Sequence, residues 1–384
     1  MKIGIDARLY GVAGPGRYIK NLIKELEDLD TKNDYIIFVS KSGSNLYHPH
    51  NPRFKKWISD YKEYSIQEQT FFLRDLLQAR LDLLHIPHFN IPILYPKKMV
   101  ITIHDLIMHK SKTSEVTTLS APKYLLKQFV YRFVTNIASF RASNIIVPSK
   151  SVGDDVVKML KYANKDKTFV TYEGVDSELL ALDNYDKKKS LMRLEEMRIV
   201  DNYFLYVGSA YPHKNLNMLL VSYKELLEKL NVRAQLVFAG RIDDFSQRLA
   251  GFSHALNLDG KVIYAARFSE TPFVTETDLA MLYKSASVYV FPSLMEGFSI
   301  TPLEAQAFGV PVLLSDIETH REVFGDSVMY FDPKSTIDLS ENMKEIYNNE
   351  VLKQELIEKG YENVKKYSWK NMASETLKVY EGSV

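Results

Sequence analysis

The sequence predicts an α/β protein built from two doubly wound, Rossmann-like domains, and three observations lead to this prediction. Short apolar runs rich in β-branched residues recur along the chain, each followed by a longer segment with helical spacing, which is typical of βα units with buried parallel strands. A polar segment at 173–198, rich in Asp, Lys and Glu, separates two groups of such runs. The 384 residues also exceed what one hydrophobic core usually organises.

The positions of the apolar runs give the expected strands. The first group lies at 2–6, 35–39, 83–86, 100–103, 144–147 and 168–171. The second group lies at 203–207, 235–239, 262–264, 288–291, 312–315 and 329–331. We therefore expect an N-terminal domain at 1–172, a linker at 173–185, a C-terminal domain at 186–367, and a Ser-capped helix at 368–384 that either closes the second domain or crosses back to the first.

Composition excludes several classes of protein. A formal net charge of +1 lacks the strong positive charge of a dedicated nucleic-acid binder, so we expect no nucleic-acid partner. The chain has no cysteine, which excludes disulfides, a thiolate nucleophile and Cys-ligated zinc. Because charged residues stand near the start and no apolar run could span a bilayer, the sequence predicts a cytoplasmic protein.

Two glutamates, Glu296 and Glu304, bracket seven residues after the expected strand at 288–291. Thr301 fits the N-cap of the following helix, Pro302 its first position and Glu304 its third, so one interpretation of Glu304 is a capping box. In the other interpretation, Glu304 accepts hydrogen bonds from ribose hydroxyls, and the positive end of the helix dipole holds a diphosphate. The sequence alone leaves both interpretations open.

A glycine-containing loop follows the first expected strand. Gly11, Gly14 and Gly16 stand there, where glycine lets the backbone approach a ligand closely. Their spacing is not G-x-G-x-x-G, and the end of the second strand at 39–41 lacks the acid that would hold an adenosine ribose. These two departures argue against a dinucleotide-binding fingerprint.

The segment 296–312 resembles the signature of the family-4 retaining glycosyltransferases. The similarity extends over essentially the whole chain and includes the stretches 4–8, 14–18, 85–90, 102–106, 206–208, 278–286 and 290–293. This resemblance implies the GT-B fold, in which two Rossmann-like domains face a central cleft. It also implies that the N-terminal domain lies on the acceptor side and that the C-terminal domain binds the nucleotide sugar.

The resemblance implies three groups of site residues. The implied catalytic residues are His104, Lys214 and Glu296. The implied donor-binding residues are Gly14, Gly16, Gly208, Ser209, Gly297, Phe298, Ser299, Ile300 and Glu304. The implied acceptor-side residues are His88, Asn90 and Asp105. We expect no metal and no cofactor, since a nucleotide-diphosphate sugar is the donor substrate.

Lys214 follows the first expected strand of the second domain, where a compact cation can neutralise a leaving diphosphate. Family members often carry arginines at two nearby positions that here hold Ser209 and His213. This departure predicts a phosphate clamp that is weaker or differently built. Arg241 and Arg267 are the candidates to substitute for the missing arginines.

We therefore expect a retaining glycosyltransferase that transfers a hexose of the mannose or glucose type from a nucleotide-diphosphate sugar to a saccharide or lipid-linked saccharide, in cell-surface polysaccharide or glycolipid synthesis. One alternative is a catalytically idle nucleotide-sugar-binding subunit, which the departures at Ser209 and His213 leave open. The other is a nucleotide-sugar epimerase of the same fold, which the segment 296–304 argues against. The sequence leaves the oligomeric state open.

Two segments bear on peripheral membrane contact. The helical segment 123–141 carries an apolar stripe that we interpret as packing against the first sheet. The members of this stripe are Leu125, Leu126, Phe129, Val130, Phe133, Val134 and Ile137. A basic, aromatic patch for an anionic membrane surface, as a lipid-linked acceptor would require, is expected instead from Arg53, Lys55, Lys56, Trp57 and Lys62.

Overall fold

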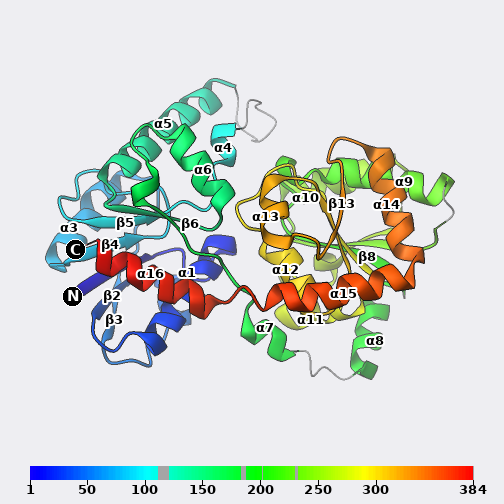
Figure 1. Cartoon of the computed structure of the whole chain (residues 1–384), viewed down its shortest axis with the longest axis horizontal. Coiled ribbons are helices and arrows are strands. Elements are labelled where there is room, and N and C mark those ends of the chain that lie inside the picture. The colour runs from blue at the N-terminus through cyan, green and yellow to red at the C-terminus, as the bar shows by residue number, and fades with distance from the viewer. Residues whose placement is uncertain (111–120, 183–186, 201, 230–231, 384) are drawn as a thin grey trace. The chain divides into compact units, whose positions relative to one another are not determined.

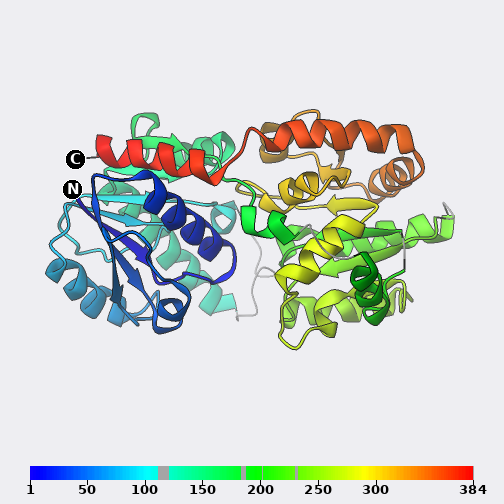
Figure 2. The same cartoon turned by 90° about the horizontal axis from the view of Figure 1, so that it is seen from below.

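The computed structural model describes residues 1–110, 121–182, 187–200, 202–229 and 232–383. The chain forms two compact units (Figures 1 and 2). Unit 1 comprises Met1–Glu173 together with Ser368–Val384, and unit 2 comprises Gly174–Tyr367. Each unit is built around its own parallel sheet, so the predicted α/β class is confirmed.

Within the described residues, unit 1 contains a seven-stranded parallel sheet in the order β3-β2-β1-β4-β5-β6-β7. Its strands are β1 (Lys2–Ala7), β2 (Asp34–Val39), β3 (Phe54–Ile58), β4 (Leu83–Ile86), β5 (Met99–Thr102), β6 (Asn144–Val147) and β7 (Thr168–Val170). All strands expected in this part of the sequence are confirmed to within one residue at either end. The central strands β4 and β5 are buried along their whole length, which is why their apolar runs identify them.

Strand β3 is not among the strands expected from the sequence. It forms the sheet edge beside β2, and its two lysines are typical of an edge strand. Lys56 Nζ donates to Ser44 O at 2.6 Å. Trp57 packs against the core, with its ring centroid 6.0 Å from that of Phe38. The aromatic ring of the basic patch expected here is therefore partly buried against the core rather than fully exposed.

Helices cover the sheet of unit 1. The described helices are α1 (Ala13–Leu29), α2 (Lys41–Leu46), α3 (Leu73–Gln78), α4 (Ile107–Lys110), α5 (Ala121–Arg141), α6 (Lys150–Met159) and α16 (Trp369–Gly382). A π-helical turn, Glu68–Phe72, precedes α3. The buried core includes Phe38, Phe72, Ile101 and Val156.

The last helix, α16, belongs to unit 1 although all of unit 2 precedes it in the chain. It packs beside α1, as the red and blue helices in Figure 1 show. The expected cap is present, since the Asn371 N–H donates to Ser368 Oγ at 3.1 Å. Tyr380 is fully buried, and its hydroxyl lies 2.5 Å from Nδ1 of His85 on β4. The helix therefore crosses back to the first unit.

Within the described residues, unit 2 contains a six-stranded parallel sheet in the order β10-β9-β8-β11-β12-β13. Its strands coincide with the expected ranges and are β8 (Tyr203–Val207), β9 (Gln235–Ala239), β10 (Val262–Tyr264), β11 (Val288–Phe291), β12 (Val312–Ser315) and β13 (Met329–Phe331). Its described helices are α7 (Ser177–Ala181), α8 (Lys187–Glu196), α9 (Leu216–Lys229), α10 (Asp244–Ala255), α11 (Glu276–Ser285), α12 (Ile300–Ala307), α13 (Glu318–Phe324), α14 (Thr336–Asn348) and α15 (Glu350–Val364). Helix α7 lies in the segment expected as a linker, and it packs against α11.

Both sheets reverse their strand order once. In unit 1 the chain moves from β1 outward to β3 and then returns to place β4 beside β1. In unit 2 it moves from β8 outward to β10 and then returns to place β11 beside β8. Doubly wound sheets bind ligands beyond the carboxyl ends of the strands at such switch points, so each unit has one place where a site is expected.

Candidate functional site

An ion pair occupies the switch point of unit 2. Lys214 ends a short 3₁₀ turn, Pro212–Lys214, after β8, and Glu296 lies in the loop between β11 and α12. The Leu294 N–H donates to His213 O at 2.8 Å and so joins the two loops. Lys214 Nζ lies 2.6 Å from Glu296 Oε1. The structure thus brings two of the expected site residues into direct contact.

This ion pair is largely shielded from water, because the side chains of Lys214 and Glu296 are 15% and 9% exposed. Burial alone would raise the pKa of Glu296, but the charge of Lys214, the nearby His213 and hydrogen bonds to the carboxylate lower it below its usual value. Thr319 Oγ1 donates to Glu296 O at 3.0 Å and steadies the loop. The site therefore holds a fixed cation and an ionised carboxylate where water screens them weakly.

Helix α12 begins at Ile300, with Ser299 as its N-cap in a left-handed conformation (φ 78°). Ser299 Oγ lies 3.1 Å from His320 Nε2, and its side chain makes no capping hydrogen bond. The prediction that Thr301 is the N-cap is wrong, since Thr301 lies inside the first turn. Its hydroxyl donates instead to Val207 O at 3.3 Å, so a tertiary hydrogen bond to β8 takes the place of the cap.

Glu304 is fully buried, and the Tyr283 hydroxyl donates to its Oε2 at 2.9 Å. Because α12 begins at Ile300, Glu304 stands at its fifth residue rather than at the third position that a capping box requires. The capping-box interpretation is therefore wrong. A ribose could reach this carboxylate only after the side chains that cover it move.

The remaining donor-side residues expected in unit 2 lie in the same two loops. Gly208 has φ 146°, and a Cβ there would lie 2.9 Å from the Tyr206 hydroxyl, so the position favours glycine. Ser209 O accepts a hydrogen bond from the same hydroxyl at 2.8 Å. Gly297 precedes Phe298, which is buried. The ring of Phe298 packs against that of Tyr367, with centroids 5.4 Å apart.

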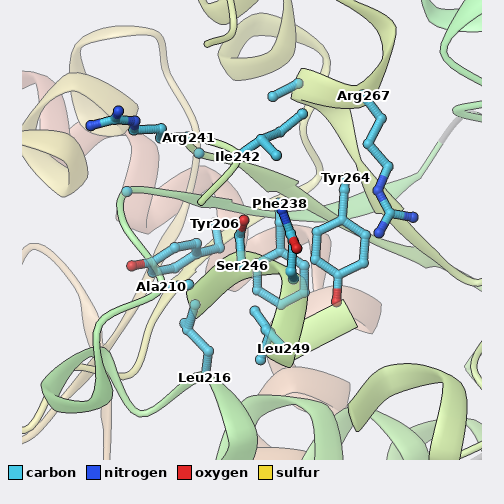
Figure 3. A pocket seen from close by; sticks show the side chains of 14 residues that line it. Tyr206, Ala210, Leu216, Phe238, Arg241, Ile242, Ser246, Leu249, Tyr264 and Arg267 are labelled. Carbon is cyan, nitrogen blue, oxygen red and sulfur yellow. The ribbon is translucent and has the colours of Figure 1, made fainter. Parts of the chain in front are cut away.

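A pocket of about 460 Å³, including space open to solvent, lies at the carboxyl ends of β8, β9 and β10 (Figure 3). The rings of Phe238 and Tyr264 stack in its lining with centroids 5.4 Å apart. Arg241 and Arg267 also line the pocket, and the Arg267 guanidinium lies 4.9 Å from the Tyr264 ring centroid. Aromatic rings beside guanidinium groups suit a ligand that is both planar and anionic.

Arg241 and Arg267 are expected from the sequence, whereas the aromatic lining of this pocket is not. Phe238 and Tyr264 stand at or next to the carboxyl ends of their strands, which is a sequence signal for a site. An aromatic residue at the end of a buried strand is equally typical of the hydrophobic core, so this signal for a binding site is weak. Positive charge at these loops and this pocket thus comes from Lys214, Arg241, Arg267 and the N–H groups at the start of α12. Among the residues that the structure describes, no group of three or more His, Asp or Glu side chains is arranged to hold a metal ion.

A second pocket lies at the switch point of unit 1 and contains a buried charge network. The Arg8 guanidinium lies 2.7 Å from Asp6 Oδ2 and 2.6 Å from Glu68 Oε1. Asn90 Nδ2 donates to Glu68 Oε2 at 2.5 Å. His88 lines the same pocket, and burial lowers its pKa to about 4, so its imidazole is neutral at pH 7. Two expected acceptor-side residues therefore share one pocket.

His104 and Asp105 follow β5 in unit 1. His104 Nδ1 lies 3.4 Å from Glu173 Oε1, and its Nε2 lies 3.3 Å from Pro87 O. These contacts fix the imidazole beside the loop that follows β4. Asp105 Oδ1 accepts a hydrogen bond from the Ile107 N–H at 2.9 Å, so the carboxylate holds the turn before α4.

Gly14 and Gly16 lie in the first turn of α1. A Cβ on Gly16 would lie 2.5 Å from Leu9 O, whereas a Cβ on Gly14 would meet nothing within 4 Å. Gly16 is therefore required by the close packing of the helix on the loop before it. Gly14 leaves open space at the helix N-terminus.

Two family models match the chain. The model described as Glycosyltransferase Family 4 matches residues 12–179, which cover most of unit 1 and the first residues of unit 2. The model described as Glycosyl transferases group 1 matches residues 195–363, which form most of unit 2 and include both Lys214 and Glu296.

Two curated relatives are similar to this chain over most of its length. The O-antigen chain mannosyltransferase RfbU of Salmonella typhimurium is 28% identical over 248 residues, which are 64% of this chain and 59% of that protein. The O-antigen chain mannosyltransferase B of Escherichia coli is 24% identical over 334 residues, which are 86% of this chain and 78% of that protein. The chain thus spans about three fifths of the length of the first relative.

Among solved structures, Anabaena Alr3699/HepE in complex with UDP and glucose superposes with a TM-score of 0.73. The identity is 15%, and the match covers 100% of each chain. This likeness shows a shared fold, and the expected GT-B class is confirmed.

Proposed function

Because this chain belongs to the family-4 glycosyltransferases, we propose that it transfers a hexose from a nucleotide-diphosphate sugar to a growing cell-surface polysaccharide or glycolipid. The names of its relatives support this proposal, since both are O-antigen chain mannosyltransferases. The hexose is of the mannose or glucose type, as the mannosyltransferase relatives and the UDP and glucose complex of the Anabaena protein suggest.

The observation that carries the proposal is the Lys214–Glu296 pair beside the start of α12, at the switch point of unit 2. We assign the donor diphosphate to this place. An ammonium group has three donors, so Lys214 can keep its bond to Glu296 and still donate to a phosphate oxygen. The N–H groups of the first turn of α12 add further positive charge.

The proposed reaction is retaining and independent of metal ions. Breaking the sugar–phosphate bond places negative charge on the leaving diphosphate and positive charge on the anomeric carbon. Lys214 and the start of α12 stabilise the diphosphate, and Glu296 orients the sugar by accepting hydrogen bonds from its hydroxyls. The acceptor hydroxyl attacks from the face that the diphosphate leaves, and a donor phosphate oxygen takes its proton. No protein nucleophile is then needed.

Arg241 and Arg267 take over from the two arginines that the chain lacks. We assign the nucleotide to the pocket that they line, with its base on the aromatic wall of Phe238 and Tyr264. Glu304 remains the proposed ribose ligand, provided that the side chains that bury its carboxylate move when the donor binds. His104 remains the proposed contact to the donor sugar, as the family resemblance implies.

The acceptor is a saccharide, which we propose to be lipid-linked. We assign its terminal sugar to the pocket of unit 1 that contains His88 and Asn90. Arg8, Asp6 and Glu68 line the same pocket, so it presents fixed donors and acceptors to sugar hydroxyls. The tight network between these three charges makes the pocket rigid.

A thermal-shift screen of UDP, GDP and ADP tests the donor assignment, because a ligand that binds only the folded state raises the melting temperature. The stabilising nucleotide identifies the donor, and Lys214→Gln should abolish its effect. NMR of the product then reports whether the anomeric configuration is retained. Donor binding without transfer to any acceptor would favour the idle nucleotide-sugar-binding subunit.

A further inference from the structure

Helix α5 turns its large apolar side chains outward. Leu126 is 64% exposed, Phe129 is 69% exposed and Phe133 is 54% exposed. Val130 and Phe140 on the same helix are also exposed. In Figure 1 the helix runs along the upper edge of unit 1. Large side chains of this kind rarely gather on a surface that faces only water.

The exposed residues form a single stripe. Leu126, Phe129, Val130 and Phe133 stand at the spacing i, i+3, i+4 and i+7, and Phe140 continues the line two turns later. We define these five residues as the α5 stripe. Its width is about 100°, as on other amphipathic helices.

The opposite face of α5, not the stripe, packs on the unit. Its buried residues, Tyr131, Thr135, Ala138 and Ser139, are mostly small, so the helix approaches the sheet closely. The prediction that the apolar stripe packs against the first sheet is therefore wrong for Leu126, Phe129, Val130 and Phe133. It holds for Ile137, which packs against the core. Small residues at helical spacing carry a weaker sequence signal than large apolar ones, which explains the error. The side chain of Leu125 lies outside the described residues.

Positive charge borders the stripe. Lys127 and Arg132 are exposed and stand on opposite sides of it, by their positions in the helical repeat. No Asp or Glu occurs in the sequence from 116 to 153. Near the C-terminal end of α5, the Phe140 ring lies 5.0 Å from that of Tyr162, and exposed Lys161 follows α6. An apolar stripe between cations, without acids, matches the surface of an anionic bilayer.

We propose that the α5 stripe docks unit 1 on an anionic lipid bilayer. The phenyl rings and Leu126 enter the interface, and Lys127 and Arg132 lie at the level of the lipid phosphates. A two-fold pairing of this face with a second copy of the chain would bring like charges together, whereas lipid phosphates neutralise them. No helix in the described part of the chain is both long and apolar enough to cross a membrane, so the inferred contact lies along the surface.

Acidic groups close to this face are few. On α6, Asp154 is exposed, and Asp155 forms an ion pair with Lys110. Lys158 and Lys161 follow them, so the adjoining segment does not reverse the positive charge. The proposed contact therefore strengthens with the fraction of anionic lipid and weakens with salt.

Co-sedimentation with vesicles of phosphatidylcholine, with and without phosphatidylglycerol, tests the proposal. The wild type should bind the anionic vesicles. Phe129→Ser/Phe133→Ser should lower the partition coefficient at least tenfold. Lys127→Gln/Arg132→Gln should lower it roughly thirtyfold at low salt, at about 1 kcal/mol for each cation. The matched control Ile337→Ser/Val351→Ser removes two exposed apolar side chains of unit 2 and should bind like the wild type.

Further measurements separate this proposal from the proposed function. The α5 variants should keep the wild-type melting temperature, nucleotide stabilisation and transfer to a soluble saccharide, because none of these depends on the bilayer. Absence of vesicle binding by the wild type, or equal binding by the α5 variants, would overturn membrane docking while leaving glycosyl transfer intact. Sedimentation equilibrium completes the test, since a dimer that Phe129→Ser/Phe133→Ser dissociates would identify a second copy as the occupant.

Discussion

Lys214 Nζ stands 2.6 Å from Glu296 Oε1, and the two residues reach each other from loops that follow the adjacent strands β8 and β11. Lys214, the proposed ligand of the donor diphosphate, thus already forms an ion pair with Glu296, the proposed ligand of the donor sugar. Since both side chains are largely buried, neither can be removed without leaving the other desolvated and unpaired. The pair has to be tested as a pair.

Lys214→Met should lower the free energy of unfolding of unit 2 by about 3 kcal/mol, because it leaves the Glu296 carboxylate buried without its cation. The double variant Lys214→Met/Glu296→Gln should recover most of this loss, since it removes both charges. Urea denaturation of the two variants and the wild type measures the difference. Lys365→Met, which breaks an exposed ion pair with Glu362, should have little effect. Additive effects of the two substitutions would show that the pair is not coupled.

Acid should weaken unit 1 through His85. Burial, and to a smaller extent His104, lowers the pKa of His85 from 6.5 to about 3. The folded state keeps this imidazole neutral, whereas the unfolded chain takes up a proton below about pH 6.5, so the free energy of unfolding falls as the pH falls from about 6.5 to about 3. His85 alone should contribute a slope of about 1.4 kcal/mol per pH unit. Urea titrations at a series of pH values should show that slope reduced in His85→Gln and unchanged in His254→Gln, a highly exposed histidine.

Glu304→Gln should separate a ribose ligand from a buried structural group. The amide oxygen can still accept the Tyr283 hydrogen bond, so the melting temperature should change little. If Glu304 accepts hydrogen bonds from the ribose hydroxyls, donor affinity should weaken by about 1 to 3 kcal/mol in this variant. The carboxylate charge that strengthens those hydrogen bonds is then lost. Tyr283→Phe is the control, since it removes the tyrosine bond and keeps the carboxylate. Unchanged donor affinity in folded Glu304→Gln would assign this residue to the core.

Arg241→Gln and Arg267→Gln should each weaken nucleotide-diphosphate binding by about 1.5 to 3 kcal/mol, the scale of a hydrogen bond to a charged group. Calorimetric titration with the nucleotide that stabilises the wild type measures this loss. Arg248→Gln is a matched control, because Arg248 lies on α10 close to the pocket but does not line it. Wild-type affinity in both pocket variants would place the phosphates elsewhere.

Transfer should continue in the presence of EDTA. Lys214, the pocket arginines and the start of α12 offer the positive charge that a divalent ion supplies in metal-dependent enzymes. Initial rates of transfer with and without EDTA, after dialysis against the chelator, test this expectation. A rate that vanishes with EDTA and returns only with a divalent ion would contradict the mechanism.

Most strands of both sheets can be located from the sequence, because buried parallel strands consist of uninterrupted apolar residues. The sequence does not predict the edge strand β3, because Lys55 and Lys56 interrupt its apolar run. Lysines are tolerated there because one side of an edge strand faces water. Helix α12 begins two residues before the expected start because its Thr301 hydroxyl bonds to β8, a contact that no local rule contains. The local sequence pattern therefore predicts where helices and strands occur better than it predicts the residues at which they begin and end.

The candidate site residues likewise include some that the sequence predicts and others that only the structure reveals. Lys214 and Glu296 each follow a strand end, so their sequence positions suffice to place them at the switch point. The network of Arg8 and Glu68 joins residues sixty positions apart, and only the folded chain shows that they meet. The sequence pattern does not predict that the α5 stripe faces outward, because periodicity locates an apolar face without showing what covers it.

Placing α16 in unit 1 also sets an order of assembly on the ribosome. Residues 1–173 leave the exit tunnel first, yet His85 and the surface of α1 stay without their helix until 368–384 have been synthesised. Unit 2 has no such dependence, because Gly174–Tyr367 is continuous and can fold as it emerges. Unit 1 therefore reaches its final packing later than unit 2, although most of its residues are synthesised earlier, and during that interval the surface of α1 that packs against α16 stays uncovered.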